Sequence, residues 1–314
     1  MRPRVSILIP CYNAERWIAQ AIESALNQTY ENKEVIVIDV GSTDNSLEII
    51  KRYSDQIQWE TQLNQGGNIA RNRLLELSTG EWLQYLDSDD YLLSDKIERQ
   101  VQFLEQVSDI DIVYSPSILE YHQGEKIWQE VLDIPEPHDP WILLARWYLP
   151  QTGSPLWRKQ AILDVGGWKV DQPCCQEHEL YLRLLIGGKK FEYCPYSGSI
   201  YRQWSESTLC KKDVSRTQKE RLAIKDRLEQ YLSQQGKLTP ERQHAINQAR
   251  FECARMIWLS DQKWAKAIIS YIKNTDSNFL PTGSSAPKNY QWAYQLLGFG
   301  LAERIAQFKR KLVC

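Results

Sequence analysis

Residues 5–50 read VSILIPCYNAERWIAQAIESALNQTYENKEVIVIDVGSTDNSLEII, and two kinds of secondary-structure pattern alternate along this stretch. Residues 4–10 are β-rich and end at a proline, and apolar side chains then recur at helical spacing from Trp17 to Leu26. Residues 34–39 form a nearly continuous apolar run, which is typical of a strand that is buried on both faces. The stretch therefore predicts a strand, an amphipathic helix and a second strand.

The same alternation continues as far as residue 115. Further strands are expected at residues 56–61, 81–86 and 111–115, and further helices at residues 46–53, 69–77 and 94–106. Repeated strand–helix–strand units predict an α/β fold, with a mainly parallel central sheet that helices cover on both faces.

The pattern becomes less regular in the middle of the chain. Residues 116–158 contain a hairpin signal around residues 123–124. A helix at residues 177–186 stops at a glycine pair, and short strands are expected at residues 191–193 and 200–202.

From about residue 215 the sequence is helical. Helices are expected at residues 217–234, 240–259, 263–273 and 290–312, the last of them amphipathic, with a polar linker of Pro, Gly and Ser at about residues 274–289. We therefore expect a main α/β domain at residues 1–210 and a helical C-terminal region at residues 211–314.

Composition excludes several classes of protein. The 314 residues are 42% hydrophobic and 25% charged, with a net charge of −2, which argues against a disordered chain and against a basic nucleic-acid binder. No apolar run approaches the roughly 18 residues of a membrane-spanning helix, and no secretory signal is apparent. The seven cysteines are odd in number and scattered. We therefore expect a cytoplasmic chain with reduced thiols and no nucleic-acid partner.

Polar side chains follow three of the predicted strands at the point where each strand ends. Pro10 and Tyr12 come at the end of the first strand, Asp39 ends the second, and Asp87 opens an acidic turn after the fourth. In an open α/β sheet, ligands bind outside the carboxyl ends of the strands. An aromatic ring and several carboxylates are therefore expected to converge on one crevice.

The acidic turn itself allows two interpretations. Asp87, Asp89 and Asp90 repel one another unless a cation or hydrogen-bond donors neutralise them. Hard divalent cations such as Mg²⁺ or Mn²⁺ take carboxylate and phosphate oxygens as ligands. The alternative is a capped helix start with solvated acids. With the strand ends converging, we favour the metal site.

A second group of acids stands at the start of the helix at residues 177–186. The helix dipole stabilises a carboxylate there, and Glu177 or Glu179 has the chemistry of a general base. Taken alone, the pattern favours ordinary helix-start chemistry over a catalytic role. Cys174, Cys175 and His178 would need a fourth ligand to form a zinc site, and none is evident. P-loop, dinucleotide-binding and hydrolase-elbow motifs are absent.

Four ordered segments together resemble family 2 glycosyltransferases, which have the Rossmann-like GT-A fold. They are residues 5–50, NQGGNIARNRLL at 64–75, YLDSDDYLLSDKIERQ at 85–100 and QEHELYLRL at 176–184. The resemblance covers roughly residues 4–208. It implies transfer of a sugar from a nucleotide-diphosphate donor, with inversion at the anomeric carbon.

The resemblance also assigns roles around the donor nucleotide. Pro10 and Tyr12 would line the nucleobase, with Tyr12 stacked on it, and Asp39 would bind the base or the ribose. Arg71 would face the nucleotide, and Arg202 would lie near the diphosphate.

The chemical groups follow from the same motifs. Asp87 and Asp89 form the D-x-D motif, with Asp89 as the direct ligand of a divalent cation, Mn²⁺ or Mg²⁺. Glu177 matches the catalytic base, and Glu179 matches the second acid of that segment. A metal would stabilise the leaving diphosphate as a Lewis acid, so one base and one displacement suffice for inversion.

Three departures from the family pattern concern the site. Val40 replaces an acid next to Asp39, Glu177 replaces the commoner Asp, and Trp204 stands where many members have His. None removes both the metal site and the base, so we expect an active enzyme. A non-catalytic nucleotide-sugar or glycan-binding module is the alternative that Val40 leaves open. A nucleotidyltransferase would need a Gly-rich signature that is missing.

The acceptor side is less defined. The Q-x-x-R-W motif of processive synthases is absent, which favours addition of a single sugar to a glycan or lipid-linked glycan in polysaccharide biosynthesis. Trp128, Trp141, Trp147, Trp157, Trp168 and Trp204 fall in this half, where we expect some to stack on a sugar or lipid.

The last helix allows two interpretations. It carries an apolar stripe beside a basic end, at Leu297, Leu301, Ile305, Phe308, Lys309, Arg310, Lys311 and Leu312. The stripe predicts either peripheral contact with the inner face of a membrane or packing against the main domain.

Overall fold

The computed structural model describes residues 2–204 and 213–313, with side chains described as far as Phe308. The chain divides into two compact units. The first comprises Met1–Pro140 and Leu149–Thr208, and the second comprises Trp141–Tyr148 and Leu209–Cys314. A short internal segment therefore belongs with the C-terminal helices.

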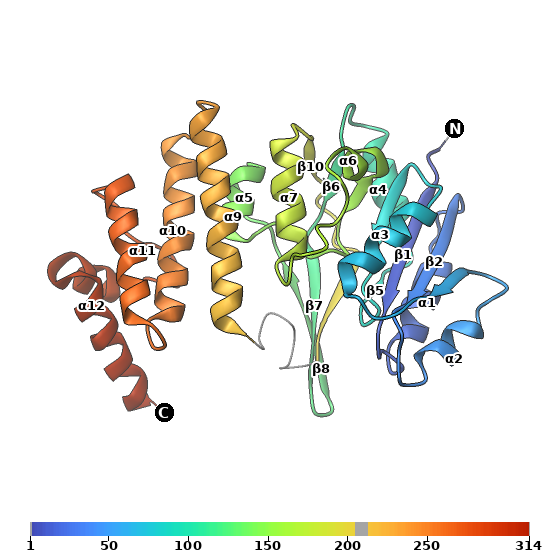
Figure 1. Cartoon of the computed structure of the whole chain (residues 1–314), viewed down its shortest axis with the longest axis horizontal. Helices are drawn as coiled ribbons and strands as arrows, with labels where there is room; N and C mark the ends of the chain where they lie inside the picture. Colours follow the sequence, from blue (N-terminus) through green and yellow to red (C-terminus); the bar gives the residue numbers. More distant parts are fainter. Residues whose placement is uncertain (1, 205–212, 314) are drawn as a thin grey trace. The chain divides into compact units, whose positions relative to one another are not determined.

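A seven-stranded sheet forms the centre of the first unit (Figure 1). Its order is β10 (Phe191–Tyr193), β6 (Ile112–Tyr114), β9 (Leu156–Arg158), β4 (Trp82–Tyr85), β1 (Val5–Cys11), β2 (Lys33–Asp39) and β3 (Gln58–Thr61). β1 runs parallel to both neighbours, so that Ile7 lies opposite Val35 of β2 and Gln84 of β4. The expected α/β fold with a mainly parallel central sheet is confirmed.

One strand of this sheet runs against its neighbours and was not predicted. β9 is antiparallel to both β4 and β6. It has three residues, too few to show periodicity, and its Trp157 is fully buried in the sheet. Trp168 is also fully buried, with its ring 6.4 Å from that of Trp157. These two tryptophans are therefore not among those that can stack on a sugar, because their rings form core.

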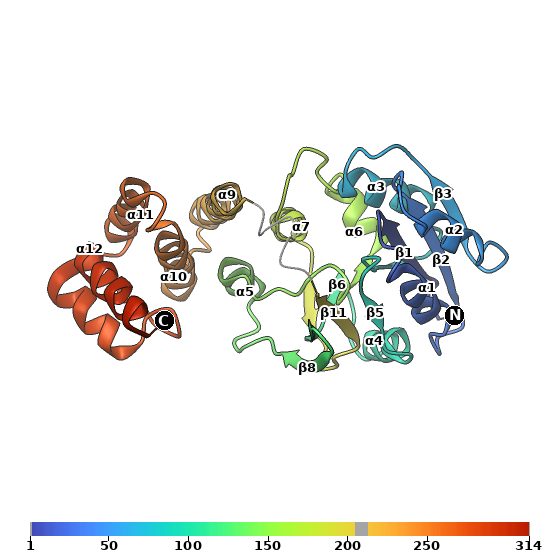
Figure 2. The ribbon, with the colours of Figure 1, turned by 90° about the horizontal axis from the view of Figure 1, so that it is seen from below.

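Helices cover both faces of the sheet (Figure 2). α1 (Ile18–Leu26), α2 (Ser46–Lys51) and α4 (Lys96–Leu104) lie on one face, and α3 (Gly67–Leu77), α6 (Lys159–Asp164) and α7 (Gln176–Ile186) lie on the other. The apolar spacing explains the packing: Ile18, Ala21, Ile22 and Ala25 of α1 are fully buried against Val5, Ile7 and Ile9 of β1.

A smaller sheet stands beside the first. Its order is β5 (Tyr91–Leu92), β11 (Ser199–Gln203), β7 (Ser117–Gln123) and β8 (Lys126–Leu132). β7 and β8 form the hairpin expected around residues 123–124. Every residue of the edge strand β8 is exposed, and the rings of Tyr121 and Trp128 stack 5.0 Å apart across the hairpin.

The second unit is helical. It contains α5 (Pro140–Arg146) from Trp141 onward, α9 (Val214–Gln234), α10 (Pro240–Ile257), α11 (Gln262–Thr275) and α12 (Lys288–Val313). Asp213, Thr239 and Asp261 cap the next three helices after α5, because each side chain accepts a hydrogen bond from a first-turn amide. Trp141 of α5 stacks on Tyr231 at 5.5 Å, and Arg146 forms an ion pair with Glu252.

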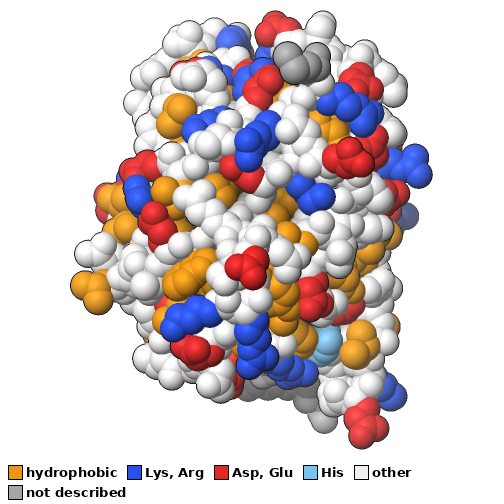
Figure 3. All heavy atoms as spheres, turned by 90° about the vertical axis from the view of Figure 1, so that its right-hand side faces the viewer, with side chains coloured by type: hydrophobic (Ala, Val, Ile, Leu, Met, Phe, Trp, Pro, Cys, Tyr) orange, Lys and Arg blue, Asp and Glu red, His pale blue; other side chains and the backbone are white. Residues whose placement is uncertain are grey.

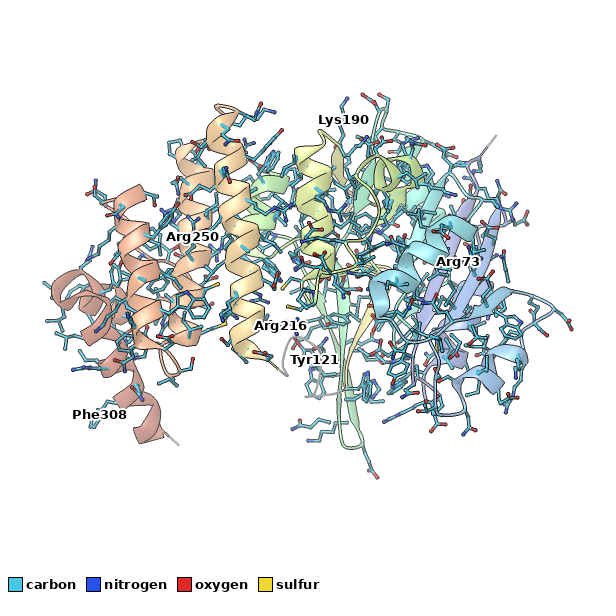
Figure 4. All side chains as sticks on the ribbon, in the orientation of Figure 1. Arg73, Tyr121, Lys190, Arg216, Arg250 and Phe308 are labelled. Carbon is cyan, nitrogen blue, oxygen red and sulfur yellow. The ribbon has the colours of Figure 1, made fainter. Side chains whose placement is uncertain are left out.

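α12 differs from the single helix that its spacing predicts. Gly298, with φ 75° and ψ 171°, breaks it into two segments. Leu297, Leu301, Ile305 and Phe308 are 40–65% exposed, and Phe308 projects outward near the end of the helix (Figure 4). At these positions the stripe is therefore largely open to solvent. Both interpretations of the stripe, membrane contact and packing against the main domain, stay predictions. The side chains of Lys309, Arg310, Lys311 and Leu312 lie outside the described residues.

Three general features concern the helices, the cysteines and the surface. In the part that the structure describes, no helix has the length and apolar character that crossing a bilayer requires. Cys11, Cys174, Cys175, Cys194 and Cys253 are buried and form no disulfide among the described residues. On the face of the first unit seen in Figure 3, Lys and Arg side chains are interspersed with Asp and Glu.

Candidate active site

The carboxyl ends of β2, β1 and β4 are adjacent in the sheet, as their end residues predicted. Cys11 at the end of β1 lies opposite Asp39 at the end of β2. Tyr12 follows with a half-exposed ring, and Pro10 is partly buried. Asp39 is 1% exposed and accepts hydrogen bonds from the Ser42 amide and the Thr61 hydroxyl. An open aromatic ring and a fixed carboxylate therefore share this edge.

Arg71 of α3 reaches the acidic turn that follows β4. Its Nη2 donates to Asp87 Oδ1 at 2.8 Å, and its Nη1 donates to Gln176 Oε1 at 2.8 Å. The guanidinium lies 4.9 Å from the ring centre of Trp168. Gly167 makes this placement possible, because a Cβ at its φ of 74° would stand 2.7 Å from Asn72 Oδ1, the acceptor of the Trp168 amide. Arg71 thus links the acidic turn to the start of α7.

Arg202 of β11 approaches the same turn from the other side. Its amide donates to Asp90 Oδ1 and its Nη1 to the Asp89 carbonyl, both at 2.8 Å. Its Nε donates to Glu120 Oε1 at 3.2 Å. The guanidinium lies between the rings of Trp17 and Tyr91, 4.4 and 4.5 Å from their centres. These contacts hold the side chain at 2% exposure.

The three aspartates of the turn have different surroundings. Asp87 pairs with Arg71 and keeps 33% of its side chain exposed. Burial, together with the negative charge of Asp87, raises the pKa of Asp89, whose Oδ2 accepts a hydrogen bond from Trp204 Nε1 at 3.0 Å. Burial and the neighbouring acids raise the pKa of Asp90 well above its ordinary value. Asp90 Oδ2 is buried and has no hydrogen-bond partner among the described residues.

Glu177 stands in the first turn of α7, which begins after Cys175 in a left-handed conformation at φ 58°. Burial opposes its ionisation, but the hydrogen bond and charge of His178, with the charge of Arg71, outweigh burial and lower its pKa to about 2. His178 Nδ1 lies 3.3 Å from Glu177 Oε1, and the Glu177 side chain is 27% exposed. The carboxylate is therefore ionised at neutral pH and still open to solvent.

Glu179, the second acid of the segment, is held in an ion pair. It is 1% exposed and pairs with Arg183 one turn later at 2.8 Å, while Arg183 also donates to the Val165 carbonyl. This pair anchors α7. Val40, where the family has an acid, is 3% exposed, so its side chain belongs to the core.

Within the described residues, no group of three or more His, Cys, Asp and Glu side chains is arranged to hold a metal. Cys174, Cys175 and His178 are therefore not arranged as a zinc site among the described residues. Asp87 and Asp89 alone would leave most coordination positions of a divalent cation to other ligands.

Sequence reasoning missed the residues that hold the two arginines in place. Trp17, Tyr91 and Glu120 surround Arg202, and Trp168 underlies Arg71. Glu120 meets Arg202 because β7 and β11 pair in parallel across some eighty residues of sequence. No local pattern in β7 signals this partner. Gln176, which accepts from Arg71, was likewise not singled out, although it adjoins Glu177.

Comparison with known proteins identifies the domain. The family model described as "Glycosyl transferase family 2" matches residues 6–153. This part of the chain belongs to glycosyl transferase family 2. The family 2 segment thus includes the ends of β1, β2 and β4 and the acidic turn, whereas Glu177 and Arg202 lie beyond it.

Relatives and solved structures agree with the family. An Escherichia coli protein named "UDP-Glc:alpha-D-GlcNAc-diphosphoundecaprenol beta-1,3-glucosyltransferase WfaP" is 41% identical over 103 residues, which cover 32% of this chain and 41% of WfaP. The chain spans less than half the length of the first curated relatives it matches.

The solved structures confirm the GT-A fold. S. aureus TarS 1-349 in complex with UDP-GlcNAc matches with a TM-score of 0.69 at 14% identity, covering 98% of this chain and 92% of TarS 1-349. The mannosyltransferase PcManGT from Pyrobaculum calidifontis, in complex with GDP-Man and Mn2+, matches with a TM-score of 0.51 at 15% identity, covering 97% of this chain and 87% of PcManGT.

Proposed function

We propose that this chain is an inverting, metal-dependent glycosyltransferase that moves a single sugar from a nucleotide-diphosphate sugar to an acceptor hydroxyl. One observation carries the proposal: Arg71 bridges Asp87 of the acidic turn and Gln176, the residue before Glu177. A donor-binding turn and a solvent-open carboxylate are thereby held beside each other. Family membership and the complexes of TarS and PcManGT with nucleotide sugars support it.

The nucleotide would bind at the ends of β1 and β2. The half-exposed Tyr12 ring offers a stacking surface for the base, with Pro10 beside it. Asp39 would accept hydrogen bonds from the base or ribose, and Ser42 and Thr61 already hold its carboxylate in place. Arg71 and Arg202 supply the positive charge that a diphosphate requires.

Asp89, with Asp87, would hold a divalent cation, Mn²⁺ or Mg²⁺. The donor set fits, because hard cations take carboxylate oxygens and accept substrate phosphates for their remaining positions. The buried, unpartnered Asp90 Oδ2 and the crowding of three acids in one turn also indicate a place for positive charge. The cation, when bound, would supply Lewis-acid stabilisation of the diphosphate.

Glu177 would act as the general base. As the acceptor oxygen forms its bond to the anomeric carbon, its proton passes to the Glu177 carboxylate. The bond from that carbon to the diphosphate oxygen breaks on the opposite face, and its electron pair leaves with the diphosphate. One displacement by one base inverts the anomeric configuration.

The test measures nucleoside diphosphate release with a panel of nucleotide sugars and divalent cations. We expect release to require a divalent cation and to fall at least about 100-fold in Asp89→Ala and in Glu177→Gln. Glu125→Gln, at the exposed tip of the hairpin, is the control and should behave as wild type. Unchanged turnover in Asp89→Ala and Glu177→Gln would reject the assigned roles.

A non-catalytic nucleotide-sugar or glycan-binding module remains the second candidate, and the buried Val40 in place of an acid favours it. Such a module would bind donor and cation in calorimetry with no transfer to any acceptor. Acceptor-dependent release of nucleoside diphosphate would exclude this candidate.

For the acceptor we propose a glycan or lipid-linked glycan of polysaccharide biosynthesis, because the name of WfaP specifies a diphosphoundecaprenol-linked substrate. The exposed stripe of α12 would give a cytoplasmic enzyme peripheral contact with the inner face of the membrane. Co-sedimentation with anionic liposomes, with and without residues 290–314, tests this contact. Equal binding by both chains would reject it.

A further inference from the structure

A groove in the second unit lies outside the site described above. α9 and α11 both pack against α10 (Figure 2). Side chains on their facing sides line an open cavity of about 350 Å³. Its walls are Lys219, Leu222, Ala223 and Asp226 of α9 and Trp264, Ala267, Ile268 and Tyr271 of α11. Both sets have i, i+3, i+4, i+7 spacing, so each helix presents one continuous stripe to the groove.

Two aromatic side chains line one wall of the groove. Trp264 is partly exposed and Tyr271 is 47% exposed, and they stand about 10 Å apart along α11 at the helical rise per residue. The exposed Ala223 and Ala267 fill little of the space between the helices. Accessible rings beside small residues offer flat apolar surfaces, on which the C–H face of a sugar ring packs.

Charged groups in the groove are balanced. Arg250 of α10 is 1% exposed, and its Nη2 donates to Asp226 Oδ1 at 2.6 Å and to Glu229 Oε2 at 2.8 Å (Figure 4). Arg250 Nη1 is buried and has no hydrogen-bond partner among the described residues. Lys219 Nζ lies 6.0 Å from the Trp264 ring centre.

This charge pattern selects the class of ligand. Two cations, Lys219 and Arg250, are offset by two carboxylates, so the groove has no excess positive charge with which to attract phosphate or nucleic acid. Aromatic surfaces with a few fixed polar groups are typical of sites for small neutral ligands. A neutral, polyhydroxylated chain fits both the apolar walls and the paired charges.

We propose that this groove binds a neutral oligosaccharide, with sugar faces on Trp264 and Tyr271 and hydroxyl groups hydrogen-bonded to Asp226 and Lys219. The site needs no nucleotide, metal or base. The inference therefore goes beyond the proposed transferase activity and does not depend on it.

The experiment titrates the full chain with cellohexaose, maltohexaose and chitohexaose, followed by calorimetry and saturation-transfer NMR. We expect at least one hexasaccharide to bind, and Trp264→Ala and Ala267→Arg each to weaken binding at least tenfold. Ala267 is exposed, so a longer side chain there fills the groove without entering the core. Ser270→Gln, exposed on α11 outside the groove lining, is the matched control and should bind as wild type.

Two results would overturn the inference. One is no binding of any of the three sugars at millimolar concentration, and the other is undiminished binding in Ala267→Arg, which would locate the sugar elsewhere. UDP binding in the same samples reports separately on the proposed function. A chain that binds UDP but no hexasaccharide contradicts the groove alone, whereas a chain that binds a hexasaccharide in the groove but neither binds nor turns over nucleotide sugars contradicts the transferase alone.

Discussion

Arg202 is a permanently charged side chain that the fold has almost wholly buried. Two aromatic rings and the Glu120 carboxylate compensate for the water that it has lost. Glu120 is 9% exposed, and it also accepts hydrogen bonds from Tyr91 and Gln129. In the proposed function, a guanidinium fixed in this way would supply preorganised positive charge close to the diphosphate without moving.

Glu120 is therefore expected to stabilise the first unit in a pH-dependent way. Burial opposes its ionisation, but hydrogen bonds from Tyr91, His122 and Gln129 and the charge of Arg202 lower its pKa from 4.5 to about 2. A carboxylate with a lowered pKa stabilises the fold at pH values above its ordinary pKa of 4.5. This contribution is lost as the pH falls toward 2. Glu120→Gln should cost about 3 kcal/mol in urea unfolding at pH 7.

The difference between wild type and Glu120→Gln should shrink steadily as the pH falls below 4.5. Glu130→Gln, on the exposed edge strand of the same hairpin, serves as the control and should show no such difference. A gap that stays constant with pH would mean that Glu120 acts through packing and not through its charge.

His178 is expected to set the acid limb of activity. Burial resists the ionisation of Glu177, and the His178 hydrogen bond and charge are the largest effects that lower its pKa to about 2. In His178→Gln the pKa of Glu177 should rise, so the pH at which activity falls on the acid side should move upward. The pH profile of kcat/KM measures this, with His244→Gln in the second unit as control. An unmoved acid limb would contradict the role of His178.

At the scale of elements, the break in α12 depends on the backbone conformation of a single residue, Gly298. Gly298 has a φ and ψ that only glycine adopts readily, and a Cβ there would meet nothing within 4 Å. The cost of Gly298→Ala is therefore conformational and not steric. We expect a loss of about 1–3 kcal/mol in the unfolding free energy of the second unit.

Gly300→Ala is the matched control for this substitution. Gly300 lies two residues further on, and its Cβ would make ordinary contacts with Trp258 and Lys266. Because alanine favours helix over glycine by up to about 1 kcal/mol, this variant should be neutral or stabilised. Equal thermal unfolding of the two variants would show that the break in α12 tolerates a side chain.

The elements also show what could be predicted from the sequence and why the rest could not. Long periodic segments such as α1 and buried runs such as β2 were found because their pattern repeats several times. The three-residue β9 repeats nothing, and its place in the sheet depends on pairing with distant strands. The carboxylates at strand ends were likewise predictable from topology, whereas the Glu120–Arg202 contact depended on a register that no local pattern encodes.

At the scale of the whole molecule, the second unit is not a simple C-terminal extension. Residues 141–148 belong to it through Trp141 on Tyr231, Arg146 with Glu252, and Trp147, whose ring lies 4.7 Å from Arg221 and Lys225. The boundary near residue 211 that we propose from the sequence therefore separates these partners.

Expressing residues 1–210 and residues 211–314 separately tests whether each fragment is stable without the other. Residues 1–210 alone should aggregate, because Trp141, Arg146 and Trp147 lose their partners in residues 211–314. Coexpression of the two fragments should restore a soluble pair that copurifies. Monomeric, soluble behaviour of both fragments made separately would contradict this prediction.

The segment at residues 141–148 restricts how the two units can be exchanged during evolution. A domain joined by one linker can be exchanged by a single recombination at that linker. Here the helical unit includes residues 141–148, which lie in the sequence between two parts of the first unit, so an exchange at residue 211 would separate Trp141 and Trp147 from their partners. A new C-terminal unit would need a matching segment near residue 141. The two parts of the chain are therefore expected to be inherited together.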